Sequence, residues 1–378
     1  MRILIFMSGF FPGKKYGGPP VSINNFCNLM NDEEVYIVCT DHDLGETKRY
    51  DSINRGWNDR GNCKVLYLED KEYGYSNLNK IAIDLKPDLI YLQSLFSRST
   101  YYGLRIGKVN NIKILLAPRG ELNSGAFRKK YKKIPYIYFL KIFKLIKDIY
   151  FQSTSIEESS SIKKQLKVSD NNIHLLHNIP SAPQNHYFYS EKVSGKGKFV
   201  FISRIHPKKN LLSAIRYFNN INGEVLFDIY GPIESKKYWK SCQDEIRKLK
   251  SNIQVNYCGI IPHSMVHDVF SKYDAFIFPT FSENFGHVIA EALSVGTIVL
   301  ISDKTPWNYL KNKGVGYVIP LTQKKMYTKV IQKIVDMNDD EIRLIKERIV
   351  RYIENNNRYK ELKIEYLNCF KSIIKEYQ

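Results

Sequence analysis

Short apolar segments alternate with longer stretches of helical periodicity along most of the chain. In the first half, the apolar segments cover residues 3–8, 35–40, 64–68, 88–93, 113–117 and 150–153. Helical patterns, such as residues 21–30 and 77–85, lie between them. Strands that are apolar almost throughout are typical of parallel sheets covered by helices on both faces. The alternation therefore predicts a doubly wound α/β sheet made of βαβ units.

The alternation stops near Pro180 and starts again further on. Residues 181–198 are rich in Ser, Pro, Gly and polar side chains, which indicates a linker. Later strands are predicted at residues 199–203, 225–230, 254–259, 275–279, 298–302 and 316–319. We therefore expect two Rossmann-like doubly wound domains, residues 1–180 and 199–355, with a cleft between them. Residues 356–378 are predicted to form a C-terminal helix that can pack back on the first domain.

The amino-acid composition indicates which class of partner the protein favours. A length of 378 residues favours two domains, and 57 Lys and Arg against 38 Asp and Glu leave a net charge of +19. This excess favours anionic partners, which include phosphates, nucleic acid and an acidic membrane surface. The six cysteines are scattered, with no Cys-x-x-Cys pair, which fits reduced thiols in a cytoplasm. No apolar run reaches the ~18–20 residues that span a bilayer.

The segment 281–296 carries the most chemical information. It places Glu283 and Glu291 eight positions apart, on either side of Gly286 at a predicted helix start. Because Glu291 lies in an apolar run, residues 288–295, its carboxylate is expected to have a polar partner. A glycine allows close approach of another molecule, and the free N–H groups of a helix start attract anions. The alternative for Glu291 is an exposed helix position.

A second polar cluster follows an earlier strand of the same predicted sheet. Arg204 and Lys209 come directly after the strand 199–203, at the end where such sheets bind ligands. Arg can fork onto phosphate oxygens, and Lys adds a point charge. Alone, this cluster could be a solvated basic loop. Together with the two glutamates at the same sheet edge, it predicts a pocket for a diphosphate attached to a hydroxyl-rich group, such as a nucleotide sugar.

These residues resemble glycosyltransferase family 4, the retaining, nucleotide-sugar-dependent enzymes with the GT-B fold. Glu283 and Glu291 match the family's Glu-x7-Glu motif, and Arg204 and Lys209 match its Arg-x4-Lys motif. The resemblance covers most of the chain and is strongest over residues 199–320. In the first half, Ala117-Pro-Arg-Gly120 and the Lys-rich segment after it resemble a subgroup that builds bacterial surface polysaccharides.

The resemblance implies a role for each motif residue. Glu291 would bind the ribose hydroxyls, and Glu283 would lie beside the transferred sugar. Arg204 and Lys209 would clamp the diphosphate and stabilise the leaving group, where negative charge grows during transfer. The donor site would also include residues at the predicted helix start and in the glycine-rich loop after the first strand: Asn284, Phe285, Gly286, His287, Gly17 and Gly18. The resemblance implies no cofactor and no essential metal, since the donor phosphate itself would accept the acceptor's proton.

The acceptor side is expected in the first domain, at Arg119 and Glu121. Many family members carry a His where this chain has Arg119, and Glu121 could instead pair with a Lys. Two metal-like patterns are discounted. The triplet from Asp41 to Asp43 is of a kind common by chance, and a pair of histidines, His263 and His267, lacks a third ligand, which favours a surface or packing role.

The segment 128–147 has eight basic residues and no acidic one. Lys141, Lys144 and Lys147 recur every three positions between aromatic and aliphatic residues. This pattern is typical of a basic amphipathic helix at a membrane surface, and Lys132 and Lys133 would share that surface. The alternative is a core helix with a solvated basic edge.

The sequence thus predicts a cytoplasmic enzyme attached peripherally to the inner face of the plasma membrane. It would transfer a sugar, with retention, from a nucleotide-diphosphate sugar to a lipid-linked or soluble glycan for O-antigen, capsule or exopolysaccharide. One alternative is a GT-B nucleotide-sugar epimerase. Another is a basic nucleic-acid-binding protein, which would show a steep salt dependence. No nucleic-acid recognition motif is present, so no such partner is expected.

Overall fold

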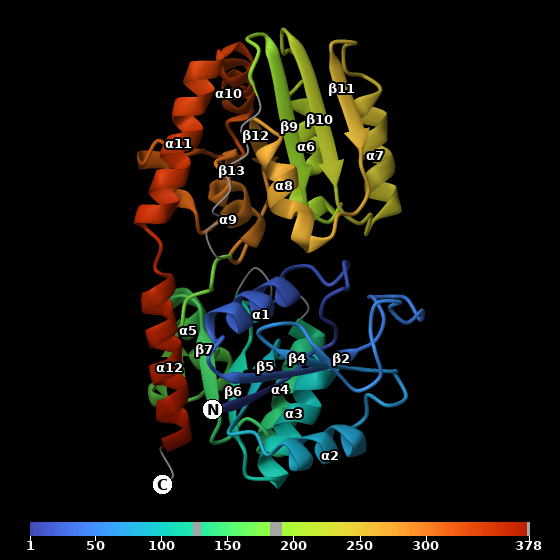
Figure 1. Cartoon of the computed structure of the whole chain (residues 1–378), viewed down its shortest axis with the longest axis vertical. Helices are drawn as coiled ribbons and strands as arrows, with labels where there is room; N and C mark the ends of the chain where they lie inside the picture. Colours follow the sequence, from blue (N-terminus) through green and yellow to red (C-terminus); the bar gives the residue numbers. More distant parts are fainter. Residues whose placement is uncertain (124–129, 182–190, 376–378) are drawn as a thin grey trace. The chain divides into compact units, whose positions relative to one another are not determined.

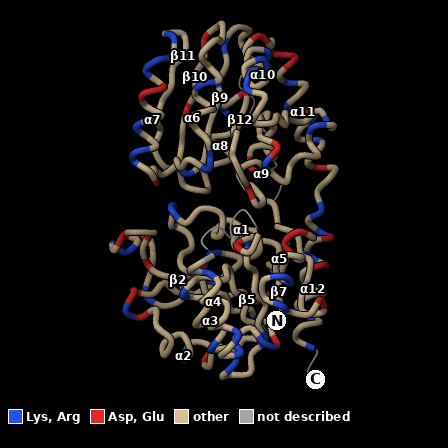
Figure 2. Tube along the Cα trace, turned by 180° about the vertical axis from the view of Figure 1, so that it is seen from behind, with Lys and Arg blue, Asp and Glu red and all other residues tan. Residues whose placement is uncertain are grey.

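The computed structural model describes residues 1–123, 130–181 and 191–375, without the side chains of Lys130 and Lys132. It divides into two compact units, which are considered separately (Figure 1). Unit 1 is Met1–Ile179 with Arg358–Gln378, and unit 2 is Pro180–Asn357. Lys and Arg are spread over both units (Figure 2), so the positive charge belongs to neither alone. Within the described ranges, no helix combines the length and apolar character needed to cross a membrane.

The sheet of unit 1 has the strand order β3-β4-β2-β1-β5-β6-β7-β8 in its described residues. The strands are β1 (Arg2–Phe6), β2 (Glu34–Thr40), β3 (Trp57–Asp59), β4 (Lys64–Leu68), β5 (Leu89–Gln93), β6 (Lys113–Ala117), β7 (Tyr150–Ser153) and β8 (Ile173–Leu175). The pairs are parallel except for β3 with β4. The short strands β3 and β8 were not predicted, because each has three residues and lacks a continuous apolar run.

The helices of unit 1 are α1 (Gly18–Leu29), α2 (Tyr75–Leu85), α3 (Arg98–Val109), α4 (Lys130–Ile142), α5 (Ile156–Leu166) and α12 (Tyr359–Lys375), with a 3₁₀ turn at Asp170–Asn172. Alternation along β1 shows how they are placed. Ile3 and Ile5 pack in the core that contains residues of α1 and α12, whereas Leu4 and Phe6 pack in the core with residues of α2 to α5. Both sheet faces are therefore covered, as the apolar strands predict.

The C-terminal helix α12 packs within unit 1. The rings of Tyr366 and Phe370 lie 5.9 Å and 5.7 Å from that of Phe26 on α1. Phe370 also lies 5.5 Å from Tyr91 on β5. The last segment of the chain thus completes the core of the first unit.

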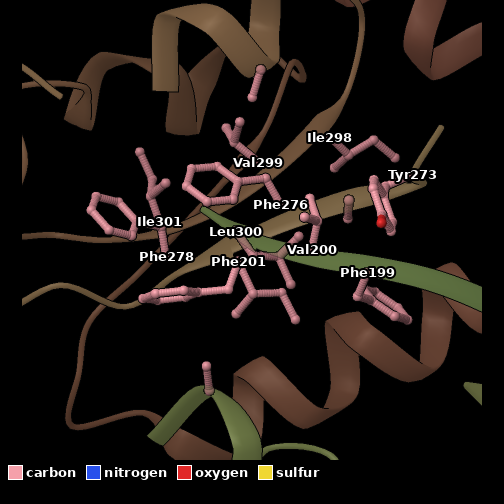
Figure 3. Close-up of a cluster of buried hydrophobic side chains, with 14 of the residues drawn as sticks. Phe199, Val200, Phe201, Tyr273, Phe276, Phe278, Ile298, Val299, Leu300 and Ile301 are labelled. Carbon is pink, nitrogen blue, oxygen red and sulfur yellow. The ribbon is translucent and has the colours of Figure 1, made fainter. Parts of the chain in front are cut away.

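The sheet of unit 2 has the order β11-β10-β9-β12-β13-β14, and its pairs are parallel. Its strands are β9 (Lys196–Ile202), β10 (Glu224–Tyr230), β11 (Ile253–Tyr257), β12 (Ala275–Phe278), β13 (Ile298–Ser302) and β14 (Tyr317–Ile319). Its helices are α6 (Leu211–Arg216), α7 (Lys236–Ile246), α8 (Val266–Ser271), α9 (His287–Ser294), α10 (Lys324–Asp336) and α11 (Asp339–Asn355), with 3₁₀ turns at Pro207–Lys209, His263–Met265 and Asn308–Asn312. Phenylalanines of β9 and β12 and aliphatic residues of β13 form its core (Figure 3).

The predicted linker needs one correction. β9 begins at Lys196, inside the stretch 181–198 that was read as linker. The reason is that Gly197 is buried against Phe199 and Val335, so a glycine that suggests a loop in the sequence is a close-packed strand position here. Residues 182–190 of the predicted linker lie outside the described residues.

Candidate functional site

The carboxyl ends of β9 and β12 form the centre of the candidate site. β9 and β10 are neighbours on one side, and the chain returns at β12 on the other side of β9. A doubly wound sheet binds ligands at such a switch point, because the loops leave it in opposite directions. The loop after β9 contains Arg204 and Lys209, and the loop after β12 contains Glu283.

Lys209 and Glu283 form an ion pair across these two loops. Lys209 is 8% exposed, and its Nζ lies 5.2 Å from the centre of the Phe278 ring. The loops are joined next to the pair, since the Asn210 side chain donates to the carbonyl of Pro279 at 2.8 Å. The sequence predicted both charged residues at this edge but not their contact with each other.

Arg204 is held by a residue that the sequence analysis missed. Its guanidinium donates to Oε1 of Glu234, in the loop after β10, at 2.6 Å. The two loops touch at Gly231, where a Cβ would lie 2.0 Å from the carbonyl oxygen of Ser203. The run of Gly-Pro-Ile-Glu directly after a predicted strand was the available signal for Glu234.

The start of α9 lies between Glu283 and Glu291, the two glutamates of the predicted motif. Gly286 has φ +80°, and a Cβ there would lie 3.0 Å from Cγ of Glu283, so the position requires glycine. The N-cap residue, Gly286, has no side chain to cap this helix, which leaves its first turn suited to an anion. The ring of His287 packs on that of Phe285, with 4.8 Å between centres, and Asn284 is exposed.

Glu291 is 4% exposed, and its Oε1 lies 2.9 Å from Nε2 of His263. The prediction that its buried carboxylate has a polar partner is confirmed, and the exposed alternative is wrong. His263 was expected to have a surface or packing role, but it bonds to this carboxylate. Burial lowers the pKa of His267, one turn further along, below its usual value.

The two acceptor-side candidates lie after β6 in unit 1, and both are bonded within that unit. The Arg119 guanidinium donates to Oε1 of Gln93 at 2.8 Å, Oδ1 of Asn178 at 2.9 Å and the Tyr91 hydroxyl at 3.1 Å. The carboxylate of Glu121 accepts from the Ser94 hydroxyl at 2.7 Å and the Leu95 N–H at 2.6 Å. Burial raises the pKa of Glu121 above its usual value.

Gly17 and Gly18, predicted to bind the donor, lie at the start of α1 in unit 1. Gly17 has φ +74° and ψ −135°, a conformation that favours glycine. Gly18 is followed by Pro19 and Pro20, which have no backbone N–H. Of the first three helical residues, therefore, Gly18 alone offers an N–H donor. This helix start is therefore a weaker anion site than the start of α9.

Asp43, part of the triplet that resembles a metal-binding motif, binds backbone N–H groups of nearby loops. Its carboxylate accepts backbone N–H bonds from Lys14 at 2.8 Å, Lys15 at 3.0 Å and Leu44 at 2.9 Å. Among the residues that the structure describes, no three His, Cys, Asp or Glu side chains gather so as to hold a metal ion.

The predicted basic helix is shorter than expected. α4 ends at Ile142, because Lys144 adopts φ +52° and turns the backbone, so the helical spacing does not reach Lys147. Lys144 and Lys147 are exposed. The Nζ of Lys133 instead donates to the Glu121 carbonyl at 2.9 Å, and that of Lys141 to the Gln165 carbonyl at 3.2 Å.

Residues 128–129 of the basic segment, and the side chains of Lys130 and Lys132, lie outside the described part of the chain. The described part has a strongly apolar exposed face. Its members are at least 39% exposed, and they are Tyr131, Ile134, Tyr138, Ile142 and Phe143. Ile137 and Leu140 face the core instead.

Part of the chain matches the model of a known protein family, and two proteins are similar to it in sequence. Residues 184–353 match the family model described as glycosyl transferases group 1. A 123-residue segment is 29% identical to the GtfA subunit of UDP-N-acetylglucosamine–peptide N-acetylglucosaminyltransferase from Streptococcus agalactiae, covering 31% of this chain and 23% of that protein. The chain is also 24% identical, over 60% of its length, to the O-antigen chain mannosyltransferase RfbU of Salmonella typhimurium, covering 61% of it. It thus spans less than two thirds of either relative.

Among solved structures, Anabaena HepE, crystallised with UDP and glucose, superposes with a TM-score of 0.72. The superposition covers 98% of this chain and all of HepE, at 14% sequence identity. At that identity the likeness shows the fold alone. The predicted GT-B fold, with two Rossmann-like units and C-terminal helices, is confirmed.

Proposed function

We propose that this chain, whose residues 184–353 match the family model of the group 1 glycosyl transferases, moves a sugar from a nucleotide-diphosphate sugar to a glycan with retention of anomeric configuration. The observation that carries the proposal is the contact of Lys209 with Glu283 at the β9–β12 switch point, with Arg204 in the same loop after β9. These loops supply two cations, each facing one carboxylate, where such sheets bind ligands. The likeness to RfbU supports a glycan of the O-antigen, capsule or exopolysaccharide kind.

The pairings within the site suggest how a diphosphate would be held. Lys209 and Arg204 each face one carboxylate, Glu283 and Glu234. A diphosphate offers several anionic oxygens, so it can draw both cations to itself, with Arg204 able to fork onto two oxygens. The uncapped start of α9 adds backbone N–H groups from the next loop.

These groups would also lower the barrier to transfer. As the glycosidic bond breaks, negative charge grows on the departing diphosphate, where Lys209 and Arg204 stabilise it most. Positive charge grows at the anomeric carbon, where the Glu283 carboxylate is favourable. With the donor phosphate accepting the acceptor's proton on the same face, no general base from the protein is needed, and the configuration is retained.

The test is an assay of the purified chain with UDP-, GDP- and ADP-sugars and a set of glycan acceptors. We expect slow hydrolysis of one donor without acceptor, and a product whose anomeric configuration matches that donor by NMR. Conversion of a nucleotide sugar to its epimer without any acceptor would instead favour the epimerase. An inverted product would contradict the retaining mechanism.

The same assay tests independence from metal. Lys209 and Arg204 already supply positive charge at the proposed diphosphate site, so we expect transfer to continue in EDTA. Loss of activity in EDTA, with recovery on adding manganese, would contradict this part of the proposal.

We further propose that the exposed face of α4 contacts the anionic inner face of the plasma membrane and that the acceptor is lipid-linked. Tyr131, Tyr138 and Ile142 recur at helical spacing on this face and are 72%, 62% and 72% exposed. Lys144 and Lys147 follow directly and are exposed. Aromatic and aliphatic side chains bordered by lysines are typical of an interfacial element, in which apolar burial and attraction to anionic lipid act together.

A further inference from the structure

The contact between His263 and Glu291 joins a predicted ribose-binding carboxylate to a residue outside the motifs. His263 begins the 3₁₀ turn after β11, and Glu291 lies in α9. Nε2 of His263 and Oε1 of Glu291 are 2.9 Å apart. The Glu291 side chain is 5% exposed and that of His263 21%, so the pair lies at the boundary between core and solvent.

In the part of the chain that the structure describes, His263 is the side chain that bonds to the Glu291 carboxylate. His267 lies close enough to interact electrostatically with Glu291, but its Nε2 is buried and has no hydrogen-bond partner. Because burial lowers its pKa, His267 is neutral at pH 7 and supplies no charge. The orientation of Glu291 thus depends on His263.

That orientation matters for binding. An ionised carboxylate has about four acceptor sites on its two oxygens, so one bond from His263 leaves room for two hydroxyl groups. A glutamate held in one rotamer has already lost the side-chain entropy that a ligand would otherwise have to overcome. Without the imidazole N–H, a carboxylate this buried would be under-solvated and would turn away.

We propose that His263 is a positioning residue for the donor: through Glu291 it sets the affinity for the ribose of a nucleoside diphosphate. This rests on the proposed function, in which Glu291 binds the ribose. His263 itself does not touch the reacting atoms, so it should affect donor binding and leave the chemical step almost unchanged.

Three substitutions separate the N–H bond from simple packing. Glutamine at 263 can place an N–H close to the position of the imidazole Nε2, whereas asparagine is too short and reaches only the position of Nδ1. Leucine keeps the bulk without a donor. His263→Gln should therefore bind like wild type, and His263→Asn and His263→Leu should bind more weakly.

The measurement is calorimetry of the full chain with UDP, GDP and ADP, followed by kinetics with the corresponding sugar donor. Loss of one hydrogen bond predicts ~3–10-fold weaker binding for His263→Leu and His263→Asn. The KM for the donor should rise in step, with kcat within about twofold of wild type. Met265→Ala, in the same 3₁₀ turn and 48% exposed, is the matched control and should change neither. Melting curves check that each variant folds.

A double-mutant cycle with Glu291→Gln separates this inference from the proposed function. If His263 acts through Glu291, the double variant should bind about as weakly as Glu291→Gln alone. Wild-type binding by His263→Leu, together with weak binding by Glu291→Gln, would overturn the positioning role and leave the function standing. Equal losses in His263→Gln and His263→Leu would also overturn it. Unchanged binding by Glu291→Gln, or no binding of any of the three nucleotides, would overturn the donor site itself.

Discussion

The carboxyl edges of the two sheets hold their charged side chains in different ways. In unit 2, Lys209 faces Glu283 and Arg204 faces Glu234, each pair joining two loops. Each of these cations faces a carboxylate of another loop, and an incoming anion could replace that carboxylate as its partner. In the proposed function, these cations exchange their carboxylate partners for an incoming phosphate.

In unit 1, the corresponding charge is built into a buried network. Arg119 donates to Gln93 and to the Tyr91 hydroxyl, and Tyr91 bonds to Gln152. Gln152 in turn donates to the Tyr366 hydroxyl of α12 at 2.8 Å. Neutral partners deep in the core are not readily exchanged for a ligand. The same kind of sheet edge therefore holds its cations by ion pairs between loops in unit 2 and by a hydrogen-bond network with neutral partners in unit 1, and we expect only the first to exchange its partners for a ligand.

The largest expected effect tests the two cations at the sheet edge of unit 2, Arg204 and Lys209. Arg204→Ala and Lys209→Ala should each slow transfer at saturating donor about a hundredfold, roughly 3 kcal/mol, because each removes a charge that is needed most in the transition state. Turnover measured with excess donor checks this. Lys208→Ala, an exposed neighbour in the same turn, should stay close to wild type. Near-normal turnover in both Arg204→Ala and Lys209→Ala would contradict a role for these cations in transfer. The sheet edge of unit 2 would then be no more a ligand site than that of unit 1.

The next effect concerns the exposed face of α4 in unit 1. Reversing Lys144 and Lys147 to Glu should weaken binding to anionic vesicles by about 2 kcal/mol or more, roughly thirtyfold, since each lysine contributes ~1 kcal/mol near such a surface. Sedimentation with vesicles at low and high salt measures it. Transfer to a short soluble acceptor should be preserved, because the proposed donor residues Arg204 and Lys209 are in unit 2.

The control for that experiment is Lys324→Glu with Lys325→Glu, an equal change of charge at exposed positions of unit 2. This control should still sediment with vesicles. If the wild-type chain does not sediment with anionic lipid even at low salt, the exposed face of α4 is not a membrane surface.

A smaller effect tests the buried hydrogen-bond network of unit 1, which runs from Arg119 through Tyr91 and Gln152 to Tyr366. Tyr366→Phe removes a buried hydroxyl that accepts from Gln152 and donates to the His177 carbonyl at 2.9 Å. Leaving these groups unpaired should lower the stability of unit 1 by about 1.5 kcal/mol. Urea unfolding measures the loss, with the exposed Tyr138→Phe as control. Nucleotide affinity should not change. A marked loss of affinity would show that this hydrogen-bond network is coupled to the donor site.

The smallest effect is a pH dependence at Glu121. Burial raises its folded pKa above the ordinary value of 4.5, so the folded state disfavours the charged form. The resulting penalty is absent below pH 4.5 and develops as the pH rises through the folded pKa. Glu121→Gln should therefore gain stability relative to wild type between pH 4 and pH 7. Unfolding curves across this range check the sign, and the opposite trend would mean that the bonds from Ser94 and Leu95 outweigh burial.

Local patterns determined much of this protein. The apolar runs predicted the long strands of both sheets, because a strand covered on both faces must be apolar along its length. The spacing of Glu283 and Glu291 around Gly286 predicted a helix start at a sheet edge, and the burial of Glu291 implied a polar partner. Such inferences succeed where the cause lies within a few residues of its effect.

Tertiary structure decided which groups meet. Lys209 and Glu283 are 74 positions apart, Arg204 and Glu234 are 30 apart, and His263 and Glu291 are 28 apart. Parallel strands bring the loops that follow them to one edge, and the strand order, rather than any local pattern, sets which loops are neighbours. The contacts of the Phe370 ring on α12 with Phe26 and Tyr91 likewise join distant segments, which periodicity along the chain does not record.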